Sequence, residues 1–104
     1  MSVLLVIKYD IRGGMAEAYV EFAKANIPAY LSAPGLTELR GYRPITGSSQ
    51  VAITFEFADL TAFATWRAHP EVERVMVESR QYGENISTEL WGPTPVAPAP
   101  LRPK

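Results

Sequence analysis

The spacing of apolar residues along this chain switches between the strand period and the helix period, and the order of the switches limits the possible folds. Strand-like segments are expected over residues 2–10, 36–43, 50–57 and 84–91, and helical segments over 15–31, 60–68 and 70–82. The element order is therefore β-α-β-β-α-β, with the second helix in two pieces. Because crossovers between parallel strands are right-handed, both helices are expected on one face of a four-stranded antiparallel sheet.

The two most apolar strands are the ones that this topology places in the centre of the sheet. Residues 3–7 are apolar without interruption, which is typical of a strand covered on both faces. In residues 50–57 the alternation puts Val51, Ile53 and Phe55 on one face. The segment 36–43 alternates poorly, which favours an edge strand. We therefore predict the α+β class and a ferredoxin-like βαββαβ domain.

Several residues mark where helices begin, bend or end. Asp59 is suited to cap a helix N-terminus, since its carboxylate can accept from free backbone N–H groups. His69-Pro70 should divide the second helix, because a residue that precedes proline avoids the helical region. Pro28 should bend the first helix near its end. Gly83 is expected to end the third helical piece as its C′ residue.

The length and the proline distribution indicate one domain with an arm. A chain of 104 residues supports a single core. We place the domain at residues 1–92. Five of the twelve residues in 93–104 are proline, which prevents helix and sheet and favours a polyproline-type arm or a disordered tail. We expect the first residues of this arm to pack on a partner subunit.

The composition excludes several classes of function. There is no cysteine and one histidine, so neither a thiolate site nor a multi-histidine metal site fits within one chain, and we expect no metal and no cofactor. The net charge of −1 argues against binding to nucleic acid or to an anionic membrane. Without a leader-like segment or an apolar run of membrane length, we expect a cytoplasmic protein.

The sheet face opposite the helices is expected to need a cover. The uninterrupted apolar run at residues 3–7 puts apolar side chains on both sheet faces, and soluble monomers rarely expose such a surface. Packing two sheets face to face about a two-fold axis would cover it. We therefore predict a homodimer that forms through the sheet face.

Candidate site residues fall on the helices and near the helix breaks. His69 is the one side chain whose ordinary pKa is near neutrality, so it is a candidate general acid or base, or a residue that satisfies a backbone group at the helix break. Asn26 can bind a ligand or a helix carbonyl. An apolar pocket with phenol and indole donors, or simply the core, is expected from the aromatic set Tyr9, Phe22, Tyr30, Trp66, Tyr82 and Trp91.

Three short motifs resemble one family. They are Ala33-Pro34-Gly35-Leu36 before the second strand, the junction from Phe55 to Phe63, and the helix break from Ala68 to Val72. Over residues 1–92 the chain resembles the dimeric α+β barrel superfamily and, within it, the group similar to antibiotic biosynthesis monooxygenases. That resemblance implies cofactor-free oxygenases, cyclases or isomerases, and it places two polar pocket residues of anthrone-type oxygenases at about Ile53 and Phe57, both apolar here.

The resemblance and the residues together give three hypotheses for the function. The first is a cofactor-independent monooxygenase that acts on a small aromatic or polyketide-like molecule, with His69 as the base. The second is a non-catalytic dimer that binds a small apolar ligand or a protein. The third is an isomerase or cyclase on the same scaffold. An open cavity between sheet and helices would favour an enzyme, and a filled core would favour the second hypothesis.

Overall fold

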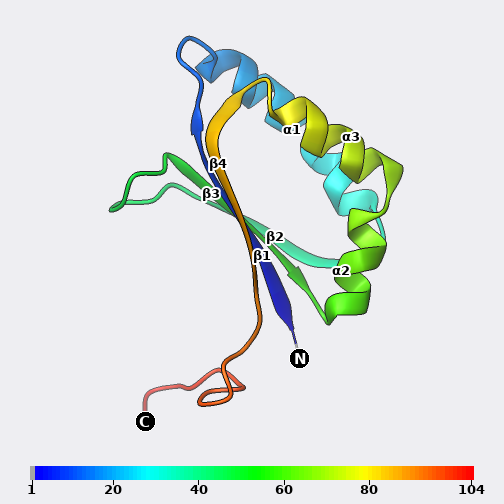
Figure 1. The fold of residues 1–104 in the computed structure, drawn as a ribbon, viewed down its shortest axis with the longest axis vertical. Helices are drawn as coiled ribbons and strands as arrows, with labels where there is room; N and C mark the ends of the chain where they lie inside the picture. Colours follow the sequence, from blue (N-terminus) through cyan, green and yellow to red (C-terminus); the bar gives the residue numbers. More distant parts are fainter. Residues whose placement is uncertain (1) are drawn as a thin grey trace.

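A computed structural model describes residues 2–104 of the chain, which form one layer of helices against one sheet (Figure 1). The first half of the chain holds β1 (Val3–Ile11), α1 (Ala16–Ser32) and β2 (Leu36–Tyr42). The second half holds β3 (Val51–Phe57), α2 (Leu60–Arg67), α3 (Pro70–Ser79) and β4 (Gly83–Trp91). The expected order of elements is confirmed, including the break between α2 and α3.

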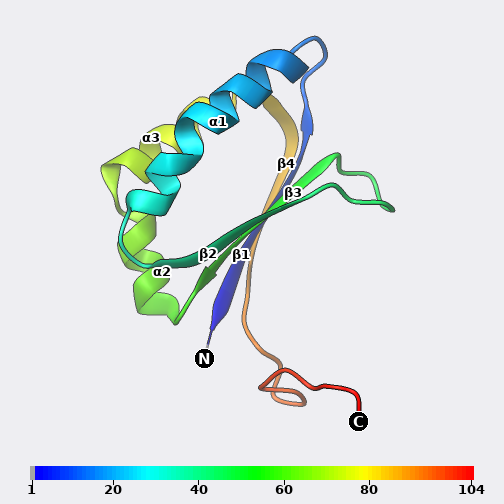
Figure 2. The same cartoon turned by 180° about the vertical axis from the view of Figure 1, so that it is seen from behind.

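The sheet has the strand order β2-β3-β1-β4, and all of its pairs are antiparallel. Strands β1 and β3 are therefore central, as their apolar sequences predict, and β2 is an edge strand. All helices lie on one face of the twisted sheet, which Figure 2 shows from behind. The ferredoxin-like α+β fold is thus confirmed.

The core lies between the helices and the inner sheet face. The register pairs Leu5 with Phe55 and Val3 with Phe57, so the inward residues of β1 and β3 form one apolar surface. Trp66 of α2 is fully buried on this surface and packs against the rings of Phe55 and Phe57. The core is therefore concentrated under α2 and the start of α3, which leaves the other end of the helical layer less filled.

Side chains cap both helices of the broken pair. The Asp59 carboxylate accepts from the backbone N–H of Ala62 at 2.8 Å, which confirms the predicted cap of α2. His69 caps α3, since its Nδ1 accepts from the backbone N–H of Glu71 at 3.2 Å. Pro70 follows at the first helical position, where its missing N–H costs nothing.

We expect Asp59→Ala to lower the free energy of unfolding by about 1 kcal/mol, because one free N–H at the start of α2 loses its partner. Urea denaturation followed by circular dichroism measures the change. Asp59→Asn is the matched control, since its amide oxygen can still accept. A loss as large for Asn as for Ala would show that the cap is not the reason.

The prediction that Gly83 ends the third helix is wrong. The helix ends at Ser79, and Gly83 is the first residue of β4, where it is buried and pairs with Ile11. A Cβ on Gly83 would lie 3.3 Å from the ring of Tyr9. The glycine therefore makes room for a tyrosine on the neighbouring strand.

A bulge in β4 lies beside Tyr9. The register pairs Lys8 with Ser87 but Asp10 with Glu84, so β4 holds one extra residue there. Asn85 in this bulge has a φ of 54°, and its side chain donates to Asp10 at 3.0 Å. Bulges bend a strand locally, and next to this one Ile86 lies on the helix side of the sheet with Thr88, where both line a cavity.

The chain beyond β4 leaves the body of the domain (Figures 1 and 2). An isolated bridge between Thr94 and Ala97 is the one ladder contact that residues 93–104 make in the described structure. Val96 and Leu101 are almost fully exposed. Separately, no helix within residues 2–104 has the length and apolar character needed to cross a bilayer.

Candidate functional site

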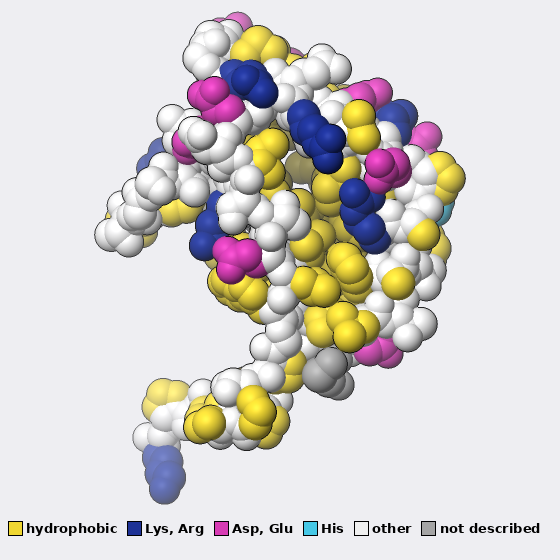
Figure 3. Space-filling model, viewed as in Figure 1, with side chains coloured by type: hydrophobic (Ala, Val, Ile, Leu, Met, Phe, Trp, Pro, Cys, Tyr) yellow, Lys and Arg dark blue, Asp and Glu magenta, His cyan; other side chains and the backbone are white. Residues whose placement is uncertain are grey.

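A cavity of about 240 Å³ lies between the inner sheet face, α1, α3 and β4. Its wall is mostly apolar, and Figure 3 shows a hollow of hydrophobic side chains on the side of the molecule where β4 faces the helices. The rim is open on the side of β4, where the wall residue Ile86 is about half-exposed. The filled core and the cavity therefore lie side by side under one helical layer.

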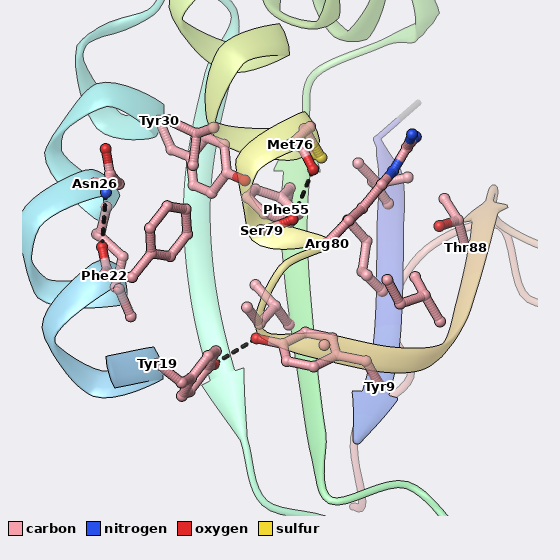
Figure 4. A pocket seen from close by; sticks show the side chains of 18 of the residues that line it. Tyr9, Tyr19, Phe22, Asn26, Tyr30, Phe55, Met76, Ser79, Arg80 and Thr88 are labelled. Atoms are coloured by element: carbon pink, nitrogen blue, oxygen red, sulfur yellow. Dashed lines mark hydrogen bonds between the residues drawn. The ribbon is translucent and has the colours of Figure 1, made fainter. Parts of the chain in front are cut away.

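Tyr30 places its phenol in the cavity wall. The residue is only 8% exposed, and its ring packs edge-on against Phe55 and beside Trp66. Figure 4 shows its hydroxyl pointing into the cavity toward Ser79, with no hydrogen bond to the residues drawn there. Burial raises the pKa of the Tyr30 phenol to about 12, although Arg67 opposes the shift. The phenol is therefore neutral at ordinary pH and can donate to a ligand.

A pair of tyrosines closes one end of the cavity. The hydroxyls of Tyr9 on β1 and Tyr19 on α1 share a hydrogen bond, and the two rings meet edge-on at 5.8 Å (Figure 4). Burial raises the pKa of Tyr9, and the hydrogen bond to Tyr19 adds to the effect. One hydroxyl of the pair donates to the other, so the pair is held together as one end of the wall, whereas the Tyr30 hydroxyl makes no hydrogen bond to the residues drawn in Figure 4.

Asn26 lines the cavity, but protein groups use its amide. Its Nδ2 donates to the carbonyl of Phe22 at 2.9 Å, and its Oδ1 accepts from Arg74 on α3 at 3.1 Å. Arg74 also contacts Glu71 and Glu78 on its own helix. Asn26 thus links α1 to α3, and of the two readings open from the sequence this geometry favours the structural one.

The charged groups on the wall are all cations. Arg67 and Arg80 line the cavity, whereas no Asp, Glu or His of the described chain does. Arg67 is paired with Glu73. Basic side chains gather beside the hydrophobic hollow in Figure 3. The cavity therefore combines a mostly apolar wall with the phenol of Tyr30 and two arginines.

The structure brings three of the seven predicted site residues together. Phe22, Asn26 and Tyr30 follow one face of α1 and line the cavity. Two others stand behind this wall: Trp66 donates from Nε1 to the backbone carbonyl of Tyr30 at 3.0 Å, and Tyr82 stacks on Phe22 with ring centroids 4.6 Å apart. Trp66 and Tyr82 thus position wall residues and do not line the cavity.

His69 and Trp91 lie away from the cavity. The His69 ring is engaged as the cap of α3 and does not contribute to the wall. Trp91 lies on the outer sheet face, where Lys8 is 5.8 Å from its ring and Glu89 accepts from its Nε1 at 3.1 Å. The catalytic role of His69 stays a prediction, without support from the geometry.

The sequence reasoning missed wall residues on other elements. They include Ile7, Tyr19, Ile53, Met76, Ser79, Arg80 and Thr88. The available signal for Tyr19 was its helical spacing from Phe22, Asn26 and Tyr30, three, seven and eleven residues further along the chain. Tyr9 was in the predicted aromatic set. Nothing in the sequence indicates that their hydroxyls meet.

The raised pKa of Tyr30 predicts a loss of stability at alkaline pH. An unfolded tyrosine ionises near pH 10, whereas folded Tyr30 keeps its proton to about pH 12. The stabilisation is therefore complete below pH 10 and falls as the pH rises toward 12, by about 1.4 kcal/mol per pH unit for one group. Urea unfolding between about pH 9 and pH 11 measures it. Tyr30→Phe should have the shallower slope, and equal slopes would contradict the assignment.

Comparison with known proteins adds a family to this geometry. A family model described as antibiotic biosynthesis monooxygenase matches residues 2–78. No curated protein matches the sequence. Among solved structures, a dabb family protein with a ferredoxin-like fold from Mesorhizobium loti aligns with a TM-score of 0.74 at 16% identity, covering 89% of this chain and 97% of that one.

Two further structures are informative. The cofactor-independent oxygenase SnoaB from Streptomyces nogalater aligns with a TM-score of 0.73 at 16% identity, over 94% of this chain and 98% of that one. A dimeric protein of unknown function and ferredoxin-like fold from Bacteroides fragilis aligns with a TM-score of 0.68 at 12% identity, over 86% and 94% of the two chains. At these identities the likeness shows a shared fold.

Proposed function

Because this chain belongs to the antibiotic biosynthesis monooxygenase family, we propose that it is a cofactor-independent oxygenase that acts on a small aromatic molecule bound in the cavity. The observation that carries the proposal is the Tyr30 phenol, which points into a mostly apolar cavity and makes no hydrogen bond to the residues drawn in Figure 4. A planar ligand with one acceptor oxygen suits such a wall, since polar groups that converge in an apolar pocket fix a ligand's orientation.

The reaction needs a substrate whose own enolate can give an electron to O₂. A ring CH₂ that is conjugated with a carbonyl through fused aromatic rings, as in anthrone, loses a proton to give an enolate. The enolate gives one electron to O₂, and the resulting radical and superoxide combine and take up a proton to give a hydroperoxide. Loss of water then leaves a second carbonyl, so that CH₂ and O₂ become C=O and H₂O. The Tyr30 hydroxyl would donate to the enolate oxygen, and the apolar walls would keep water from the intermediates.

Oxygen uptake with anthrone tests this proposal. Chelator-treated protein should consume one O₂ per anthrone and form anthraquinone faster than buffer alone. Ala23 lines the cavity and Ala25 lies exposed on the same helix. Ala23→Phe should abolish the uptake by filling the cavity, and Ala25→Phe should retain it. Uptake no faster than in buffer would refute an oxygenase that acts on this class of substrate.

The proton acceptor is a separate question, because the described cavity wall holds no carboxylate and no histidine. We expect His69→Asn to keep the uptake, since asparagine can replace the cap and His69 does not reach the wall. In that case the substrate loses its proton to solvent at the open rim. A large fall in uptake with an unchanged melting temperature would restore His69 as the base.

The same absence of a base favours a second candidate function, a non-catalytic binder of aromatic ligands. The two candidates differ in one result. If anthrone binds in the cavity while oxygen uptake stays at the rate of buffer, the protein is a binder. An isomerase or cyclase would instead convert its substrate without consuming O₂.

We further propose that the chain forms a homodimer through the outer sheet face. That face exposes Tyr42 and Trp91 to about one half and includes Leu4 and Val6 of the central strand. The arm at residues 93–104 leaves from the end of β4 and would pack on the second copy, which would cover its exposed Val96 and Leu101.

Light scattering at micromolar concentration should therefore give twice the chain mass of 11.5 kDa. Leu4→Lys should lower the mass toward that of one chain, because the change buries a charge in the proposed interface. Val77→Lys, at an exposed position on α3, is the control and should leave the mass unchanged. A wild-type mass of one chain would contradict the dimer.

A further inference from the structure

We propose that the ligand of the cavity carries an acidic group and that Arg80 binds it at the rim. This inference rests on the proposed ligand site and names a class within it, aromatic molecules with a carboxylate or another anionic substituent. It starts from the charge on the cavity wall, where the described residues include two arginines and no carboxylate.

The two arginines differ in what already holds them. Arg67 is paired with the carboxylate of Glu73, so its charge is balanced within the protein. For Arg80, no carboxylate within residues 2–104 lies at ion-pair distance from the guanidinium. Glu84, which follows on β4, pairs with Arg12 instead, at 3.8 Å. Arg80 is thus the arginine of the cavity wall whose charge is not balanced by a carboxylate of the described residues.

The main chain of Arg80 is held firmly while its side chain is available. Its carbonyl accepts from Nε and Nη2 of Arg12 at 3.3 and 3.2 Å, which fixes the position just after α3. Figure 4 shows the side chain extending from this point through the space between Met76 and Thr88, at the open side of the cavity. A fixed backbone under a free guanidinium suits bidentate binding of a carboxylate.

The two polar contacts that a ligand would make lie at different depths in the cavity. The Tyr30 hydroxyl lies inside the cavity and donates to a neutral or weakly basic oxygen, whereas Arg80 lies at the rim, where an ionised group keeps part of its water. An aromatic acid that carries an oxygen substituent on its ring, at the end opposite the carboxylate, can make both contacts. The same geometry disfavours cationic ligands, because the wall of the described structure offers them no anion.

A matched pair of probes tests the inference: 6-hydroxy-2-naphthoic acid, which is ionised at neutral pH, and its methyl ester, which is not. NMR titration of ¹⁵N-labelled protein gives both dissociation constants and shows whether cavity amides move. We expect the acid to bind about ten-fold more tightly than the ester. Added NaCl, to about 0.5 M, should weaken binding of the acid and leave the ester unchanged.

Two variants assign the preference to a residue. Arg80→Gln should reduce the acid's advantage to less than about two-fold without weakening the ester. It should fold normally, because no carboxylate within residues 2–104 pairs with the Arg80 guanidinium. Arg43→Gln removes an exposed cation outside the cavity wall and should keep the full preference. Arg80→Lys should keep part of it, since the charge remains but the bidentate geometry is lost.

The outcomes separate this inference from the proposed function. Equal binding of acid and ester at the cavity would overturn the acidic-group inference and leave the ligand site standing. A preference that survives in Arg80→Gln would overturn the role of Arg80. If neither probe moves the cavity amides, the ligand site itself is wrong, and the inference that rests on it falls as well.

Discussion

Replacing Trp66 with alanine should lower the free energy of unfolding by about 3–5 kcal/mol. Trp66 is fully buried, packs against Tyr30, Phe55 and Phe57, and donates its Nε1–H to the carbonyl of Tyr30. The substitution removes these contacts and leaves a void beside a cavity that already exists. Because the free energy of unfolding of a small domain is only about 5–15 kcal/mol, the variant would lose a large part of its stability. Urea unfolding followed by far-UV circular dichroism measures the change.

Trp66→Phe separates packing from the hydrogen bond. It keeps most of the apolar contact but loses the donor to the Tyr30 carbonyl, so we expect a smaller loss, of about 1–2 kcal/mol. A loss for Trp66→Ala below about 1 kcal/mol would mean that α2 is not anchored in the way the structure shows. Such a result would also weaken the argument for Tyr30, whose ring Trp66 holds in place.

Replacing Tyr30 with phenylalanine should change ligand binding strongly and stability hardly at all. The hydroxyl makes no hydrogen bond to the residues around the cavity, so its removal leaves no protein group without a partner. A ligand whose enolate oxygen accepts from it should bind about ten-fold to a hundred-fold more weakly. Titration of anthrone under nitrogen, followed by protein fluorescence, measures the affinity.

The control for this prediction is Tyr19→Phe, because the Tyr19 hydroxyl already has a partner in Tyr9. That variant should lose some stability, since the part-buried Tyr9 hydroxyl then loses its partner, and it should keep most of its ligand affinity. The reverse pattern, with Tyr30→Phe unstable and still able to bind, would show that the phenol of Tyr30 is structural.

The fold could be predicted because it depends on local patterns. The period of the apolar residues located every strand and helix, and Asp59 and His69-Pro70 marked the start of α2 and the break before α3. Gly83 was misread because its glycine is required by Tyr9, a residue on the neighbouring strand. Such a requirement arises only when distant segments meet, so a local pattern does not contain it.

The candidate site was predicted less completely, for a related reason. Of the predicted site residues, Phe22, Asn26 and Tyr30 of α1 line one wall of the cavity. The sequence did not show that protein groups occupy the Asn26 amide while the Tyr30 hydroxyl points into the cavity, since that depends on Arg74 of α3. Arg80 gave no signal either, because an arginine after a helix is usually solvated.

A crystal structure of the protein grown with anthrone under nitrogen tests the central claim most directly. We predict the ligand in the cavity between Phe22 and Met76, with its oxygen within hydrogen-bonding distance of the Tyr30 hydroxyl. Ala23→Phe crystals grown in the same way should show no ligand there. Anthrone bound on the outer sheet face, or a cavity left empty at saturating ligand, would contradict the claim.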